Sequence, residues 1–134
     1  MRYSAVKFLA LGTVALLIFT GCRLSANGHR NDYHGSGRMI TETRTVGECE
    51  GITLQNQGNV YLTQDDNQSI RIEADDNIMG KVIVERRHGI LVVGLKDGDY
   101  SDVTLKVYVS MKHINSLSIE GAGTIECSNR IETE

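Results

Sequence analysis

The chain has 134 residues, with 14 Lys and Arg against 17 Asp and Glu, 40% hydrophobic residues, no Pro and no Trp. This length allows one domain at most, and a net charge of −3 gives no field that would attract nucleic-acid phosphates. The three Cys are too few and too scattered for a disulfide-rich miniprotein or a zinc site with C-x-x-C spacing. We therefore expect one small domain without a nucleic-acid partner.

The N-terminus, residues 1–21, has the pattern of a signal peptide. Arg2 and Lys7 precede an apolar run, and a small residue and Cys22 follow it. The run is shorter than the roughly 20 apolar residues of a membrane-spanning helix. Its end resembles the lipobox of bacterial lipoproteins, whose Cys is acylated and becomes the mature N-terminus. That resemblance implies lipid attachment at Cys22, and the alternative is an ordinary signal peptide with an incidental Cys.

Residues 22–37 are predicted to be a flexible tether between the lipid and the folded domain. They are rich in Gly, Ser and Asn and show no apolar periodicity. Acyl chains on Cys22 would fix the protein to a membrane at one end. Arg23 follows the Cys, in place of the Asp that retains many Gram-negative lipoproteins at the inner membrane. The resemblance therefore favours the outer membrane, with the domain facing the periplasm or the cell surface.

Residues 38–134 have the alternating apolar and polar pattern of half-buried β-strands. Clusters of Asn, Asp and Gly separate these runs, as expected for tight turns. No stretch has a 3.6-residue apolar stripe, so the fold class is all-β, with at most one helical turn over 76–80. The expected strands cover residues 52–54, 60–62, 70–74, 82–84, 90–95, 103–109 and 117–119.

Two of these segments repeat at an offset of 65 residues. They are Ile52-x-Leu54-x-x-x-Gly58-x-Val60-x-Leu62 and Leu117-x-Ile119-x-x-x-Gly123-x-Ile125-x-Cys127. Each has an aliphatic pair, a corner at Gly and a second inward pair, which favours a solenoid of stacked coils. A small antiparallel β-sandwich satisfies the same alternation. Without residues 1–21 the only aromatics are Tyr, so the core must be aliphatic, which favours thin stacked strands.

The same region resembles a known family. Residues 47–64, 69–77 and 117–123 look like the head GIN domain of putative auto-transporter adhesins, a bacterial domain of unknown function. The resemblance runs from about Arg38 to Cys127 and implies a right-handed β-helix-like fold in the cell envelope, without catalytic residues. Members usually continue through further strands, so we expect a C-terminally short, truncated form. Its open end would be covered by self-association or by a strand supplied from elsewhere.

Cys49 and Cys127 both fall at predicted inward positions. Outside the inner membrane the environment is oxidising, so two thiols that meet would form a disulfide. The alternative is two separate buried thiols that act as small hydrophobic residues. The sequence favours neither the disulfide nor the two separate thiols.

Clustered acidic residues raise the possibility of an enzyme. β-Helices host polysaccharide lyases and hydrolases, and the candidate carboxylates here lie in predicted turns, where Asp is common for backbone reasons. His29, Asp32 and His34 invite a metal site, but they lie in the tether and lack a fourth ligand. We expect no catalytic residue, no metal and no cofactor. The candidate carboxylates are Asp65, Asp66, Asp75, Asp76, Asp97, Asp99 and Asp102.

The sequence therefore predicts a lipid-anchored cell-envelope protein with a non-catalytic, adhesin-like β domain. Its partners would be the membrane through the anchor and either a second copy or another envelope protein or glycan. The competing hypothesis is a carbohydrate-active or calcium-dependent β-helix enzyme.

Overall fold

The computed structural model describes residues 30–132, so the predicted signal peptide, Cys22 and His29 lie outside the described residues. Within this range the fold is all-β, as predicted, and the only helix is the 3₁₀ turn η1 (Met79–Lys81). The strands are β1 (Asp32–His34), β2 (Met39–Thr43), β3 (Gly51–Gln64), β4 (Ser69–Asp75), β5 (Val82–Arg87), β6 (Ile90–Leu95), β7 (Asp99–Ser101), β8 (Leu105–Met111) and β9 (Ser116–Cys127).

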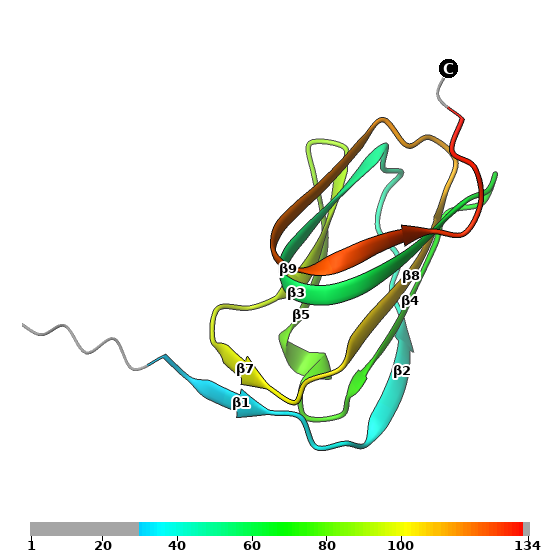
Figure 1. Cartoon of the computed structure of the whole chain (residues 1–134). Coiled ribbons are helices and arrows are strands. Elements are labelled where there is room, and N and C mark those ends of the chain that lie inside the picture. The colour runs from blue at the N-terminus through cyan, green and yellow to red at the C-terminus, as the bar shows by residue number, and fades with distance from the viewer. Residues whose placement is uncertain (1–29, 133–134) are drawn as a thin grey trace, which may run out of the picture.

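Seven strands form one mixed sheet that curls into a half-barrel (Figure 1). Their order is β2-β4-β8-β3-β6-β5, and β9 pairs with β3 as well. Strand β3 bends in the middle, so that residues 51–55 pair with β6 and residues 59–64 pair with β8. The pairs of β3 are parallel, whereas β4 with β8, β2 with β4 and β5 with β6 are antiparallel. A single mixed sheet differs from the antiparallel sandwich considered above.

The predicted 65-residue repeat is confirmed as a parallel pair of strands. Gly51 to Leu62 of β3 lie beside Ser116 to Cys127 of β9, residue for residue, at that offset. Parallel strands in register place like residues on top of one another, so each aliphatic residue of β9 lies above an aliphatic residue of β3. A complete solenoid stays a prediction, because the other strands of the sheet do not repeat this arrangement.

The hydrophobic core lies inside the curl and is almost wholly aliphatic. Strands β3, β4, β6 and β8 direct alternate side chains into it, and most of these are less than 3% exposed. No aromatic side chain is buried among residues 30–132, in agreement with the prediction from composition. The largest fully buried side chains are Ile52, Leu54, Leu62, Ile70, Ile72, Ile78, Leu91, Leu95 and Met111.

The predicted tether is wrong for its last residues. Asp32–His34 form strand β1, which pairs in parallel with β7. The Tyr33 ring stacks on Tyr100 with 5.2 Å between centroids, and the Lys81 ammonium lies 3.9 Å from the Tyr33 centroid. Aromatic stacking and a cation–π contact stabilise a strand too short to show alternation in the sequence.

Candidate functional site

Strand β9 lies at an edge of the sheet, beside β3, and is the candidate functional site. Eleven of its twelve residues are exposed, and only Ile125 is half-buried. Leu117 and Ile119 are 43% and 46% exposed, although they lie above the fully buried Ile52 and Leu54. Exposed aliphatic side chains that lie side by side make this strand a candidate interaction surface. We call residues 116–127 the β9 surface.

Two glycines allow β9 to lie against β3. Gly121 and Gly123 have φ values of 131° and 156°, where other residues are strained. A Cβ on either residue would lie 2.2 Å from a backbone carbonyl oxygen of β3, at Asn56 or Gly58. Asn56 itself has a φ of 65°, and its side-chain amide donates a hydrogen bond to the Leu95 carbonyl at 2.7 Å. The bend shared by the two strands therefore depends on Gly121 and Gly123, which have no side chain, and on Asn56, whose side chain is held by a hydrogen bond.

Polar side chains on the outer side of β3 and β9 form a ladder at the same 65-residue offset. The Gln55 amide donates to the Glu120 carboxylate at 3.2 Å, and the Thr124 hydroxyl donates to the Asn59 amide oxygen at 3.1 Å. The ladder continues beyond the strands, where Asn129 bonds to the backbone of Gln64. Cross-strand pairs of this kind fix the register of a strand.

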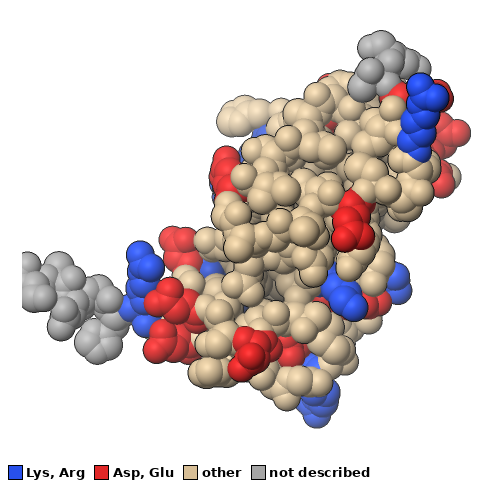
Figure 2. Space-filling view, viewed as in Figure 1, with Lys and Arg blue, Asp and Glu red and all other residues tan. Residues whose placement is uncertain are grey.

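Few charged side chains lie over β3 and β9 in the middle of the molecule (Figure 2). Uncharged residues cover most of the centre of this view, with single charged side chains among them, and other Lys, Arg, Asp and Glu residues lie around its rim. Protein-binding surfaces are depleted of charge at their core in the same way.

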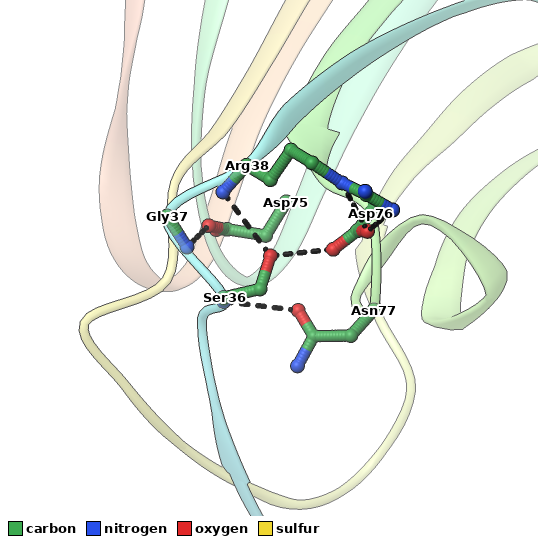
Figure 3. Close-up of polar contacts among 6 residues, drawn as sticks. All are labelled: Ser36, Gly37, Arg38, Asp75, Asp76 and Asn77. Carbon is green, nitrogen blue, oxygen red and sulfur yellow. Dashed lines mark hydrogen bonds and ion pairs between the residues drawn. The ribbon is translucent and has the colours of Figure 1, made fainter.

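The buried and half-buried carboxylates at the end of β4 hold the chain together rather than a substrate. Asp75 is 1% exposed and accepts hydrogen bonds from the backbone N–H groups of Gly37 and Thr104, each at 2.8 Å. Asp76 accepts from the Ser36 hydroxyl and from the Arg38 guanidinium (Figure 3). These hydrogen bonds, with Ser36 first and Arg38 second, lower the pKa of Asp76. Both carboxylates therefore bind the segment that leads into β2, and Asp75 also binds the segment that leads into β8.

The sequence itself matches one family model. The model described as "Putative auto-transporter adhesin, head GIN domain" covers residues 49–134 of the chain. The chain belongs to the head GIN domain family. This match contains both strands of the 65-residue repeat and the β9 surface, and it indicates no catalytic family. Among curated proteins, none matches the chain.

Solved structures share the fold of this head GIN domain at low sequence identity. A putative adhesin from Bacteroides fragilis is 24% identical with a TM-score of 0.65, over 72% of this chain and 46% of that one. A putative lipid binding protein from Parabacteroides distasonis is 18% identical with a TM-score of 0.64, over 73% and 44%. A putative adhesin from Parabacteroides merdae is 18% identical with a TM-score of 0.63, over 73% and 42%. The chain thus corresponds to less than half the length of these proteins.

The two cysteines of the head GIN domain are both free thiols, so the candidate disulfide is not formed in the structure. Cys49 is buried just before β3, whereas Cys127 is exposed at the end of β9, where its register partner is Leu62. Burial raises the pKa of the Cys49 thiol, and nearby Arg86 opposes this shift. A raised pKa keeps the thiol protonated, which is the reverse of what a catalytic cysteine requires.

The other predicted polar residues are dispersed. Asp65 and Asp66 lie in the turn after β3, and Asp97, Asp99 and Asp102 lie around β7. Within residues 30–132 no group of three His, Cys, Asp or Glu side chains is placed to hold a metal ion. In the same part of the chain, no helix is long and apolar enough to cross a membrane.

The outer face carries an aromatic row that the sequence did not predict. The Tyr61 and Tyr108 rings stack with 5.0 Å between centroids, and the Arg71 guanidinium lies 4.3 Å from the Tyr108 centroid. These residues are register partners on β3, β8 and β4. Their outward positions in alternating strands were visible, but the order of the strands was not.

Proposed function

We propose that this protein is a lipid-anchored, non-catalytic binding protein of the bacterial cell envelope, adhesin-like in action, which binds its partner through the β9 surface. The observation that carries the proposal is the exposure of Leu117 and Ile119 on a strand with a free edge. Exposed strand edges bind extended segments of other proteins by β-augmentation. Membership of a family described as putative auto-transporter adhesins agrees with such a role.

The anchor in this proposal is a lipid on Cys22, and the location is the outer membrane. It is supported by the lipobox-like sequence that ends in Cys22 and by Arg23 in the following position. The tether would then run from Cys22 to the start of β1 at Asp32, about ten residues, which span at most roughly 35 Å when fully extended. This length lets the domain stand clear of the membrane surface.

We also infer that the β3 and β9 pair is one step of a right-handed, β-helix-like solenoid. The support is the residue-for-residue register of twelve positions and the repeated glycine corner. In a solenoid each coil covers the aliphatic row of the one before it, as β9 covers β3.

Metabolic labelling tests the anchor. A palmitate analogue should label the wild-type chain and leave the Cys22→Ala variant unlabelled, whereas Cys127→Ala, which removes the exposed thiol of β9, should be labelled like the wild type. Equal labelling of the Cys22→Ala variant would overturn the anchor.

A binding assay tests the surface. Beads that carry the chain should retain material from the envelope fraction of the producing bacterium, and a Leu117→Asn, Ile119→Asn double variant should lose most of this retention. The matched control is Met39→Asn, Ile40→Asn on β2, which changes two aliphatic residues of similar exposure, 42% and 37%. Equal retention by both double variants would show that the β9 surface is not the binding site.

A further inference from the structure

The outer edge of β9 lacks several of the usual protections against pairing. Within residues 30–132, β9 pairs only with β3, so one row of its backbone N–H and C=O groups has no strand beside it. Natural edge strands are commonly protected by Pro, by Lys or by a short length. Residues 116–127 read SLSIEGAGTIEC, with twelve residues, no Pro and no Lys.

The alternation of apolar and polar residue types in β9 is symmetric about Ala122. Gly121 mirrors Gly123, and Ile119 mirrors Ile125. The next inward pair is Leu117 and Cys127, both of which are apolar. The outward pairs are Glu120 with Thr124 and Ser118 with Glu126, so each acidic residue mirrors a neutral hydroxyl residue.

The bend of β9 has the same symmetry as its sequence. The strand bends sharply near the middle of its length (Figure 1), and Gly121 and Gly123, which have positive φ values, lie in the middle of its sequence. A two-fold axis that bisects this bend exchanges the arm 116–120 with the arm 124–127 and keeps inward residues inward. Two copies of β9 related by this axis lie edge to edge and antiparallel, corner upon corner.

We propose that a second copy of this chain pairs with the first through the β9 edges, antiparallel about a two-fold axis at Ala122. The partner of the surface assigned under the proposed function is then another copy of the same protein. In this dimer Ile119 faces Ile125 of the other copy and Leu117 faces Cys127, while Glu120 faces Thr124 and Glu126 faces Ser118. The contact is isologous, as closed dimers require.

The charged residues and the glycine bend of β9 favour this register over registers shifted by one or two residues. A shift by one residue would turn the aliphatic row of one copy to the outside. A shift by two toward the C-terminus would place Glu120 opposite Glu126, and like charges directly opposite are unfavourable. A shift by two in the other direction would place Gly123 opposite Ile119, so the two corners would no longer coincide.

The contact is one strand wide, so a weak dimer is expected for the free chain. Attachment of two copies to one membrane raises their effective concentration and favours pairing. This inference rests on the proposed function for that concentration effect, but its geometry does not depend on the lipid.

Cysteine crosslinking of the full chain in its membrane tests the geometry. In a Cys127→Ser parent, Ala122→Cys lies on the axis and should form a disulfide-linked dimer under copper phenanthroline. Glu120→Cys and Thr124→Cys should each give little dimer alone, and should give a strong dimer when the two variants are expressed together. The parent controls for crosslinks through Cys22 and Cys49.

Several outcomes would overturn the proposal. They are the absence of dimer from both Ala122→Cys and the mixed pair, equal crosslinking by Glu120→Cys alone, and a crosslink of Ala122→Cys to a protein of another mass. The last would assign the β9 surface to a different partner. Palmitate labelling of the same samples reports separately on the anchor, so failure of the anchor and failure of the dimer are distinguishable.

A charge series at Ser118 gives an independent measurement. In the dimer Ser118 of each copy faces Glu126 of the other copy, so the contact contains this pair twice. Ser118→Lys should therefore raise the association constant of the dimer by about 2- to 30-fold, and Ser118→Glu should lower it by a similar factor. The yield of Ala122→Cys crosslinks measures both effects. Equal yields from the two variants would contradict the register.

Discussion

At Gly121 the absence of a side chain decides how closely two strands approach. A Cβ there would lie 2.2 Å from the Asn56 carbonyl oxygen, at a φ of 131°. We expect Gly121→Ala to lower the free energy of unfolding by about 1 to 3 kcal/mol, because the strand must shift or the backbone must be strained. Gly80→Ala is the matched control, since a Cβ at Gly80 meets no atom within 4 Å. Urea denaturation of both variants measures the difference, and equal losses would contradict the explanation.

The Asp76 carboxylate should make the free energy of unfolding depend on pH. Its pKa is lower in the folded protein, because Ser36 and Arg38 donate hydrogen bonds to it. Such a group stabilises the fold above its unfolded pKa, about 4, and this contribution is lost as the pH falls through the folded value. Asp76→Asn should therefore be destabilising at pH 7 and closer to the wild type at pH 3. Unfolding free energies at the two pH values test this, and a difference that does not change with pH would count against it.

Individual residues were predicted unevenly from the sequence. The pairing of Leu54 with Ile119 and of Gly58 with Gly123 followed from the repeat, because register depends only on matching patterns. The role of Asp75 did not follow, because it depends on Gly37 and Thr104, which are distant in sequence. Its turn position suggested a solvated carboxylate, whereas the side chain is buried.

Strand β1 shows how a short element depends on side chains from elsewhere. Its three residues are stabilised by Tyr100, through stacking on Tyr33, and by Lys81. We expect Tyr33→Ala to release β1, with loss of hydrogen-exchange protection at residues 32–34 and 99–101 and unchanged protection in β3. Tyr61→Ala, which alters the other stacked pair, is the control and should leave β1 protected. Unchanged protection of β1 in Tyr33→Ala would show that the aromatic contact is dispensable.

Elements with alternating residues were predicted well and irregular ones were not. Strands β4, β6 and β8 coincide closely with the predicted segments. Each Gly corner was expected to separate two short strands, but β3 and β9 continue through it as single strands of 14 and 12 residues. The reason is that glycine permits the bend without breaking the ladder. Strands β2 and β7 lack a distinct alternation and were missed.

Over the whole molecule, the contribution of aliphatic side chains to stability should decrease from the central strand β3 to the edge strand β9. Leu54 is 1% exposed and Ile119, directly above it on β9, is 46% exposed. Leu54→Ala should lower the unfolding free energy by about 2 to 5 kcal/mol, and Ile119→Ala by less than about 1 kcal/mol. Denaturation at low protein concentration tests the order, and a larger loss for Ile119→Ala would contradict it.

The all-β class, the aliphatic core and the 65-residue repeat could be predicted for the whole molecule, because each depends on local pattern or composition. The mixed order of the strands could not. Parallel contacts of β3 with β6 and β8 are determined by long connections, on which alternation within a strand carries no information.

The position of β3 has a consequence for how the chain folds. All three of its partners, β6, β8 and β9, come later in the sequence. An N-terminal portion that has already been synthesised therefore contains an apolar strand with no neighbour, and the closing contacts bridge 65 residues. Contacts between residues so far apart form slowly, so β3 gains its full set of neighbours only after β9 has been made.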